Sequence, residues 1–230
     1  MKKIIVTGGL GQIGSHITEL LLQRGDKVIV IDNLETGRKE HLESHENLEI
    51  IIDTIADRKM LDKVIGDFRP DAIVHTAASY KDPDNWYEDT ITNTVGSINV
   101  TKASTEFKVE KLVNLQTALC YGRTKKVPIS VKEPIAPFTS YGISKTAGEL
   151  YMLNSGLPVV SLRLANIISP RLSIGPIPTF YKRLKSNQSC FCSDAIRDFI
   201  DFDDFLDLLD ICLNSKNHKG AFNVSTGQGH

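Results

Sequence analysis

Four closely spaced glycines near the start of the chain have a spacing that suits phosphate binding. Gly8, Gly11 and Gly14 fit the pattern G-x-x-G-x-x-G, and Gly9, Gly11 and Gly14 also fit G-x-G-x-x-G. A backbone without Cβ atoms can approach a pyrophosphate closely, and the N-terminus of a following helix offers N–H donors and a partial positive charge. The glycines stand between a β-branched run and an amphipathic run, so we predict a strand, a dinucleotide-binding turn and a helix.

Asp32 ends the next apolar run, 18 residues after Gly14. At that place a carboxylate accepts a hydrogen bond from an adenosine-ribose hydroxyl, and it repels a 2′-phosphate. We therefore expect NAD to be preferred over NADP. Arg38 is near enough in sequence to favour a phosphate, whereas Asn33 and Leu34 offer no phosphate ligand. The alternative is an ordinary glycine-rich turn followed by an exposed strand-end aspartate.

Three tyrosines are followed four residues later by a lysine, a spacing that puts both side chains on one face of a helix. The pairs are Tyr121/Lys125, Tyr141/Lys145 and Tyr181/Lys185. The first lies in "YGRTKKVP", which is typical of a loop. The last lies in a basic segment with no hydroxyl-bearing strand end before it. Only the middle pair opens a helical pattern, "TSYGISKTAGELYML", and follows a strand whose end offers Thr117.

Tyr141, Lys145 and Thr117 together can move a proton to and from an alcohol. A tyrosine that acts as a base near neutral pH needs its pKa lowered from about 10 to near 7, which takes about 4 kcal/mol. The Lys145 ammonium and a positively charged nicotinamide ring favour the phenolate. Thr117 would hydrogen-bond the substrate oxygen that gains negative character. The alternative is a surface helix with an incidental pair.

Short apolar runs alternate with amphipathic segments through the first two-thirds of the chain, which predicts an α/β fold. The runs lack polar alternation, as in parallel strands buried on both faces. Predicted strands are 3–7, 27–32, 48–52, 72–75, 112–115 and 159–162, and predicted helices are 12–24, 57–65, 90–104 and 140–153. This order indicates a Rossmann-type doubly wound parallel sheet with ligands at the carboxyl ends of its strands.

The composition changes after about residue 170, where Pro, Gly and Ser become frequent. We predict a basic helical piece at 181–185, a helix over 198–213 and a strand at 220–226. The expected organisation is a nucleotide-binding domain over 1–167. Residues 168–230 would form a small, incomplete C-terminal substrate lobe, with a helix and a strand that return to the sheet. The chain stops directly after that strand, so we expect a truncated chain.

The composition excludes several classes of protein. Hydrophobic residues make up 41% and charged residues 24% of the 230 positions, which is ordinary for a globular protein. The formal net charge is −1, so no basic surface for nucleic acid is expected. The longest stretch without a charged residue, 4–18, is too short and too rich in glycine to span a membrane. Four cysteines without a C-x-x-C pair indicate reduced thiols in the cytoplasm.

The remaining histidines and cysteines of interest are interpreted as structural or pocket residues, and not as metal or redox sites. His41 and His45 are four residues apart, but no third ligand is evident and a solvated surface is expected, with no metal site. Cys190 and Cys192 are too close for a redox pair, and we expect them to line the substrate pocket. His75 ends a buried strand and is interpreted as a hydrogen-bonded core histidine.

Taken together, these pieces resemble the extended short-chain dehydrogenase/reductase family, in its nucleotide-sugar epimerase/dehydratase branch, and among its members bacterial O-antigen cluster epimerases. The resemblance runs through essentially the whole chain in the family's order. The matching pieces are "TGGLGQIGSH", "IDNLETGR", "VHTAA", "NTVGSINV", "LQTALCYG", "SYGISKTAGE", "LRLANIISPR", "GPIPTFYKRL", "IRDFID" and "FNVSTGQG". One departure is "CFCSDAIRDF", which lacks the family's usual glycines before its arginine.

The resemblance implies roles for individual positions. Those expected to bind NAD are Gly8, Gly11, Gln12, Ile13, Gly14, Asp32, Asn33, Leu34, Thr36, Gly37, Asp53, Thr54, Thr76, Ala77, Ala78, Asn93, Tyr141, Lys145 and Ala165. Asp53 and Thr54 would meet the adenine, and Asn93 would lie near Lys145. The positions expected to hold a UDP-linked sugar are Asn166, Ile177, Phe191 and Arg197. A homodimer through the helices at 90–104 and 140–153 is also implied.

The implied activity is NAD-dependent epimerisation at C4 of a UDP-linked sugar through a transient 4-keto sugar, in surface-polysaccharide biosynthesis. Family members that eliminate water carry Asp-Glu after the strand-end Thr, whereas here Ala118 and Leu119 follow Thr117. Alternatives are a 4,6-dehydratase or 4-reductase of the same family and, in a different class, a non-catalytic cofactor-sensing regulator. Retention of Tyr141, Lys145 and Thr117 argues against the regulator.

Overall fold

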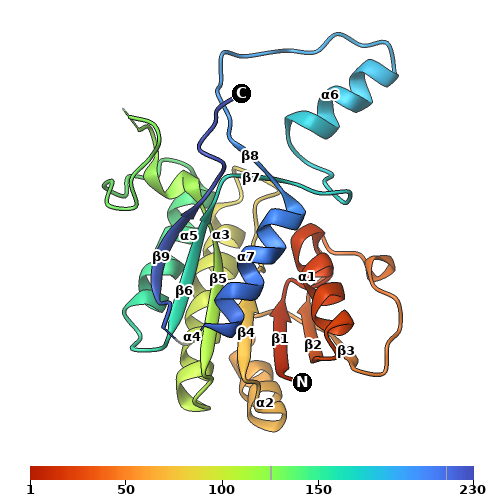
Figure 1. The fold of residues 1–230 in the computed structure, drawn as a ribbon, viewed down its shortest axis with the longest axis vertical. Coiled ribbons are helices and arrows are strands. Elements are labelled where there is room, and N and C mark those ends of the chain that lie inside the picture. Colours follow the sequence, from red (N-terminus) through yellow and green to blue (C-terminus); the bar gives the residue numbers. More distant parts are fainter. Residues whose placement is uncertain (125, 216) are drawn as a thin grey trace.

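The computed structural model describes residues 1–124, 126–215 and 217–230, and it contains one large parallel β-sheet (Figure 1). Its strand order is β3-β2-β1-β4-β5-β6-β9, which is the order of a dinucleotide-binding fold with one strand added at the β6 edge. The strands are β1 (Lys3–Thr7), β2 (Lys27–Asp32), β3 (Leu48–Ile52), β4 (Ala72–His75), β5 (Lys111–Thr117), β6 (Val159–Leu164) and β9 (Gly220–Val224). The predicted doubly wound parallel sheet is confirmed.

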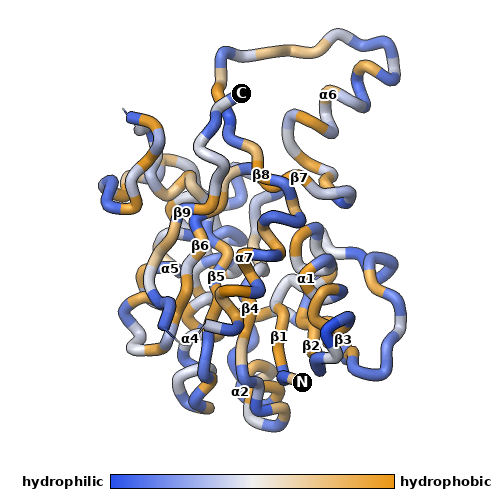
Figure 2. The backbone as a smooth tube through the Cα atoms, viewed as in Figure 1, coloured by the Kyte–Doolittle hydropathy of each residue, from blue (hydrophilic) through white to orange (hydrophobic). Residues whose placement is uncertain are grey.

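Helices cover both faces of this sheet and form two apolar cores. On one face, α1 (Gln12–Gln23) and α7 (Phe202–Asn214) pack on alternate strand residues such as Val6 and Val113. On the other face, α2 (Arg58–Phe68), α4 (Ser97–Glu106) and α5 (Ser140–Leu153) pack on residues such as Ile5 and Leu112. Apolar strands lie between the polar helix surfaces (Figure 2). Each fully buried Ile or Leu contributes about 1.5–3 kcal/mol.

The strand at 48–52 differs from the prediction of burial on both faces. β3 is an edge strand that pairs only with β2, and helices cover neither of its faces fully. Ile50 and Ile52 are 36% and 42% exposed, and Glu49 is also exposed. The sequence has the apolar residues of a central strand, but position within the sheet decides which faces are covered.

The predicted continuous helix 90–104 is wrong in its details. A short helix, α3 (Trp86–Asp89), comes first, then a π-helical turn, η2 (Thr90–Gly96), and only then α4. Packing against the neighbouring loop accompanies this change, since a Cβ on Gly96 would lie 2.5 Å from the Ile55 side chain. A π-turn widens the helix locally and has no periodic signal of its own in the sequence.

The predicted helix 198–213 begins later than expected. Residues Phe199–Asp201 form β8, which pairs in parallel with β7 (Asn166–Ile168) in a separate two-stranded sheet. The Asp201 carboxylate then caps α7 by accepting from the backbone N–H of Asp203, at 2.9 Å. The two short strands lie beyond the carboxyl end of β6, where they frame the opening of the site described below.

The C-terminus of α7 is held by two lysines from the far end of the sheet. The Lys2 ammonium donates to the carbonyl of Leu213 at 2.9 Å, and the Lys111 ammonium donates to the carbonyl of Ser215 at 2.8 Å. Cations at this end of a helix satisfy orphan carbonyls and oppose the negative end of the helix dipole. The start of β1, the start of β5 and the end of α7 are thus tied together.

Helix α6 (Pro176–Lys185) stands apart from the sheet and none of its residues is buried (Figure 1). It extends the predicted basic piece 181–185 toward the N-terminus, with Pro176 at its first turn, a position that proline favours. Within the described ranges, no helix is long and apolar enough to cross a membrane.

Candidate active site

A cleft of about 810 Å³ lies along the carboxyl ends of the parallel strands. It runs from the glycine-rich turn after β1 to the start of α5 and on to β7 and α6. Most of the residues that the sequence singled out line it, namely Gly8, Gly11, Gln12, Ile13, Gly14, Asp32, Asn33, Thr36, Asp53, Thr54, Thr76, Ala77, Ala78, Thr117, Tyr141, Lys145, Ala165, Asn166 and Ile177. The fold therefore brings the predicted cofactor, catalytic and substrate positions to one cavity.

The glycine-rich turn is packed so tightly that side chains would not fit. Gly8 has a φ of +69°, and a Cβ there would lie 2.7 Å from the backbone of Ala77. A Cβ on Gly14 would lie 2.2 Å from the carbonyl oxygen of Gly8. The N-terminus of α1 has no side-chain cap, so its first N–H groups are open to the cleft. This cradle fits a pyrophosphate between backbone and helix end.

Asp32 is a buried carboxylate that lines the cleft beside the glycine-rich turn. Its oxygens accept backbone hydrogen bonds from Leu10 at 2.9 Å and from Leu34 at 2.8 Å, so it links the glycine-rich turn to the loop after β2. A Cβ on Gly37 would lie 2.5 Å from the same carboxylate. Each carboxylate oxygen has two acceptor sites, so a ribose hydroxyl can still be bound.

Five predicted site residues do not line the cleft. Leu34 and Gly37 lie against Asp32, as just described, and Asn93 is fully buried beneath the cleft wall. Phe191 is 85% exposed in the long loop between α6 and β8. Arg197 is also exposed, and its guanidinium reaches the side-chain oxygen of Asn166 at 3.4 Å. Roles of these five in ligand binding remain predictions.

Asn93 joins the loop after β4 to helix α5. Its amide donates to the Ser79 carbonyl at 2.9 Å and to the Ser144 hydroxyl at 3.0 Å. Its side-chain oxygen accepts from the Ser79 N–H at 2.9 Å. Lys145 directly follows Ser144, so Asn93 lies beside the candidate catalytic turn, as the resemblance implies, and braces it from below.

Tyr141 and Lys145 lie one helical turn apart at the start of α5. Thr139 caps this helix by accepting from the Gly142 N–H at 3.1 Å, which fixes where the helix begins. Burial lowers the pKa of Lys145 to about 8, and the nearby Glu149 carboxylate opposes that shift. Thr117 ends β5 and lines the same cavity, and its hydroxyl accepts from the backbone N–H of Leu119 at 3.2 Å. One base candidate, one cation and one hydroxyl therefore face a single space.

The pKa of Tyr141 is raised, first by burial and then by Tyr80 and Asp89. Burial and nearby negative charge thus disfavour the phenolate, and a cation beside the phenol would favour it. The ring of Tyr80 meets the Tyr141 ring edge-on, with centroids 6.1 Å apart.

The cleft has further polar lining residues that were not singled out from the sequence. Among them are Tyr80, Asp89 and Gln116. Tyr80 follows the strand-end piece "VHTAASY", where an aromatic residue so close to a strand end is a usable signal. Asp89 is 1% exposed, and neither of its oxygens has a hydrogen-bond partner among the described residues. Gln116 directly precedes Thr117 and looks like an ordinary strand residue in the sequence.

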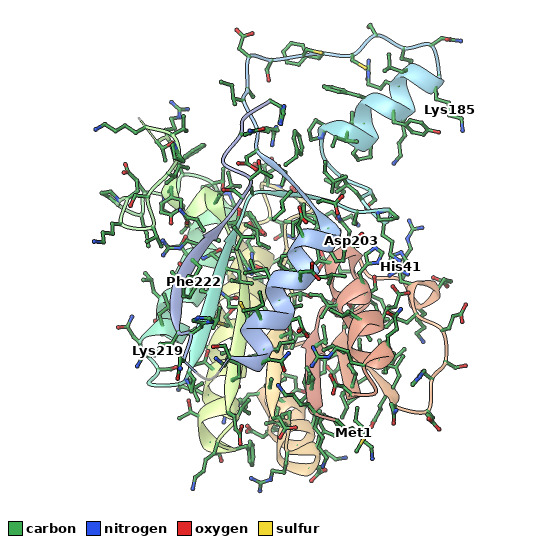
Figure 3. All side chains as sticks on the ribbon, viewed as in Figure 1. Met1, His41, Lys185, Asp203, Lys219 and Phe222 are labelled. Carbon is green, nitrogen blue, oxygen red and sulfur yellow. The ribbon has the colours of Figure 1, made fainter. Side chains whose placement is uncertain are left out.

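In the other two Tyr/Lys pairs, the residues that the structure describes do not line the cleft. The Tyr121 hydroxyl donates to Asn223 at 2.6 Å and accepts from Arg163 at 2.9 Å, so it has a structural role. Its partner Lys125 lies outside the described residues. Tyr181 and Lys185 lie on α6, where Figure 3 places Lys185 at the outer end. Neither location contradicts the choice of the middle pair.

Two weaker expectations are corrected and one is confirmed. Cys190 and Cys192 do not line the cleft, because the loop that carries them extends away from the body. His41 is partly buried, with its ring bonded to the Leu10 carbonyl at 2.8 Å, and is not merely solvated surface. His75 is a core histidine, bonded to the hydroxyls of Thr7 at 2.8 Å and Ser97 at 3.0 Å.

Asp32→Asn and Asp32→Ala are expected to narrow the preference for NAD over NADP by about tenfold, because the charge that repels a 2′-phosphate is removed. Asp32→Ala should also weaken the binding of both cofactors, since the bonds to Leu10 and Leu34 are lost. Isothermal titration of each variant with both cofactors measures this. If the ratio of the NADP Kd to the NAD Kd is the same in wild type and in Asp32→Asn, Asp32 does not select between the two cofactors.

Comparisons with known proteins agree with this geometry. The profile of the "NAD dependent epimerase/dehydratase family" matches residues 4–225. A curated UDP-glucose 4-epimerase of Lacticaseibacillus casei is 37% identical over 184 residues, which is 75% of this chain and 54% of that protein. The chain thus spans about half the length of that relative.

Two solved structures are similar over the whole chain. The Bordetella bronchiseptica enzyme WbmG, in complex with NAD and UDP, has a TM-score of 0.97 and 54% identity, and the match covers 100% of this chain and 74% of WbmG. The enzyme WbmH of the same organism, in complex with NAD⁺, has a TM-score of 0.96 and 48% identity, with 100% and 77% covered.

Proposed function

The chain belongs to the NAD-dependent epimerase/dehydratase family, and from this we propose that it binds NAD and epimerises a UDP-linked sugar at C4 through a transient 4-keto sugar. The observation that carries the proposal is the continuity of the cleft. One cavity joins the glycine-rich turn and Asp32 to Thr117, Tyr141 and Lys145. A cofactor bound at the first end reaches the proton-transfer groups at the other.

The residues present fit NAD. The turn at Gly8, Gly11 and Gly14 would hold the pyrophosphate, and Asp32 would accept from the adenosine ribose. Lys145, a buried cation facing the cavity, would hold the second ribose. NAD held in this way would supply an acceptor for the C4 hydrogen as hydride and a donor for its return.

Tyr141 accepts the proton of the sugar's 4-hydroxyl as the C4–H bond breaks, which leaves a neutral ketone. The Lys145 ammonium favours the phenolate form of Tyr141, against the burial and negative charge that oppose it. Thr117 donates to the same oxygen while it carries negative charge. Tyr141 returns its proton when hydrogen is restored to the opposite face of C4, so the reaction is redox-neutral overall.

Elimination of water is disfavoured by what surrounds Thr117. Ala118 and Leu119 follow it in a short 3₁₀ turn, and Leu119 lines the cleft. Neither side chain can remove the C5 proton or protonate a leaving hydroxyl. The 4-keto sugar therefore has return of the hydrogen as its accessible fate, which favours epimerisation over dehydration.

The substrate end of the cleft suits a UDP-linked sugar. Asn166 and Ile177 line it, and Arg197 reaches Asn166 from outside. The similar enzyme WbmG was solved with UDP, which supports the same nucleotide here. We place the reaction in surface-polysaccharide biosynthesis. All four cysteines are free, which agrees with the cytoplasmic location expected for a reduced protein.

A homodimer is part of the proposal. Three apolar side chains on α5 are about half exposed, Ile143 at 52%, Leu150 at 45% and Tyr151 at 56%. Leu150 and Tyr151 border a groove against α4. A second copy of these helices would cover that apolar surface, and sedimentation velocity of the protein distinguishes monomer from dimer.

Incubation with NAD and UDP-glucose or UDP-N-acetylglucosamine is expected to give an epimer of unchanged mass and no net NADH. Mass spectrometry with chromatographic separation of epimers, and absorbance at the NADH band, measure these. A product lighter by one water would contradict epimerisation. Stoichiometric NADH would indicate a dehydrogenase, and NAD binding without any turnover would favour a cofactor-sensing protein.

A further inference from the structure

We propose that Gln116 is a positioning residue, which holds Thr117 at the end of β5 in fixed register with the Lys145 turn of α5. The inference rests on the proposed function, since it concerns the groups assigned there to catalysis. The side-chain amide of Gln116 lies between β5 and α5, and each of these elements carries part of the candidate site.

Both polar ends of the Gln116 side chain are engaged. Its amide nitrogen donates to the backbone carbonyl of Lys145 at 3.0 Å. Its side-chain oxygen accepts from the backbone N–H of Thr117 at 2.7 Å. The residue is 2% exposed and lies at the cleft wall. The planar side-chain amide of Gln116 thus connects the backbone of Thr117 to the backbone of Lys145.

The position of Gln116 on the strand makes a polar residue there costly. Along β5, Leu112, Asn114 and Gln116 face α5, and the first of these belongs to the apolar core. A parallel strand beneath a helix usually has apolar residues on that face. A buried amide is tolerated only when its donors and acceptors are paired. Both ends of the Gln116 amide are hydrogen-bonded to backbone groups, one of Lys145 and one of Thr117.

A directional bond matters here because Thr117 and Lys145 come from different elements. Apolar attraction is non-directional, whereas a hydrogen bond fixes both a distance and an angle. A misplacement of about 1 Å in a reacting group can reduce a rate by about 100-fold. Among the described residues, the Gln116 amide is the side chain that bonds directly to both catalytic segments.

Asn114 provides a matched control. It lies two residues earlier on the same strand and face, is 2% exposed, and donates to the Ser161 hydroxyl at 3.0 Å. It bonds to β6 instead of to the Lys145 turn, and it does not line the cleft. Replacing either amide with leucine removes one buried polar group from the same strand, so losses of stability should be similar.

The test compares Gln116→Leu with Asn114→Leu in the full chain. We expect kcat with a UDP-sugar to fall 10- to 100-fold in Gln116→Leu, with KM and the NAD Kd within threefold of wild type. Asn114→Leu should lower the melting temperature similarly but keep kcat within threefold. If Gln116→Leu does not fold, Gln116→Glu, which keeps the acceptor for Thr117 and loses the donor to Lys145, is measured instead.

The outcomes separate this inference from the proposed function. Wild-type kcat in the Gln116 variant, or an equal loss of kcat in Asn114→Leu, would overturn it. If the wild type interconverts no UDP-sugar, the proposed function fails. In that case a crystal structure of Gln116→Leu tests the positioning role of Gln116. We expect Thr117 to be displaced relative to Lys145. An unchanged arrangement of these two residues would overturn the inference.

Discussion

Tyr141→Phe is expected to lower the turnover of a UDP-sugar by about 1,000-fold or more, while the NAD Kd stays within threefold. The substitution removes one oxygen atom from a ring that is already packed against Tyr80. Proton transfer by a positioned side chain typically contributes 10²–10⁴-fold. The phenol acts in the transition state, so kcat and kcat/KM should fall together. Steady-state kinetics and titration with NAD measure the two quantities.

Tyr121→Phe is the matched control for this experiment. Tyr121 is also buried, and its hydroxyl has two hydrogen bonds, to Asn223 and from Arg163. Its loss should cost about 1–3 kcal/mol of unfolding free energy, because the buried Arg163 guanidinium loses an acceptor. Turnover should remain within a few-fold of wild type. Activity of Tyr141→Phe within tenfold of wild type would refute the assignment of the base.

Gly14→Ala is expected to weaken NAD binding by at least about 100-fold and to abolish turnover. Its Cβ would lie 2.2 Å from the carbonyl oxygen of Gly8 and 2.8 Å from the Cα of Gly9, both of which are backbone atoms. Backbone cannot move aside as a flexible side chain can, so the turn must open. An opened turn no longer brings its N–H groups together around a pyrophosphate.

Gly25→Ala separates loss of the site from loss of stability. Gly25 follows α1 with a φ of +79°, so alanine is strained there, although no atom lies within 4 Å of the added Cβ. The unfolding free energy should fall by about 1 kcal/mol, with NAD affinity unchanged. Differential scanning calorimetry of Gly14→Ala and Gly25→Ala, each with and without NAD, measures the stability of each variant and its stabilisation by NAD. Near-normal NAD affinity in Gly14→Ala would mean that the turn is not the pyrophosphate site.

The parts predicted well from the sequence are those in which local pattern and chemistry coincide. Gly14 and Asp32 have the spacing of a cofactor turn, and both line the cleft. The Tyr141/Lys145 pair was separated from two other pairs by its helical context. The hydrophobic periodicity also placed the main strands, because a strand buried on both faces leaves an uninterrupted apolar run.

The parts predicted poorly depend on contacts between distant segments. Residues 199–201 are a strand because β7 lies beside them, and nothing in their own composition separates them from the helix that follows. Phe191 and Cys192 lie outside the cleft because of the path of a long loop. Asp89 and Gln116 are common residue types in ordinary positions, and only the packing of α5 against β5 and the α3–η2 segment makes them part of the site.

The lysine ties at the end of α7 have a consequence for how the protein is made. Lys2 bonds to Leu213, which is 211 positions later in the chain. Phe205 and Leu209 of the same helix close the apolar face formed by β1, β4 and β5. During translation that face stays uncovered until α7 has emerged. Contacts over such separations form slowly, so we expect the docking of α7 to be a late step in folding.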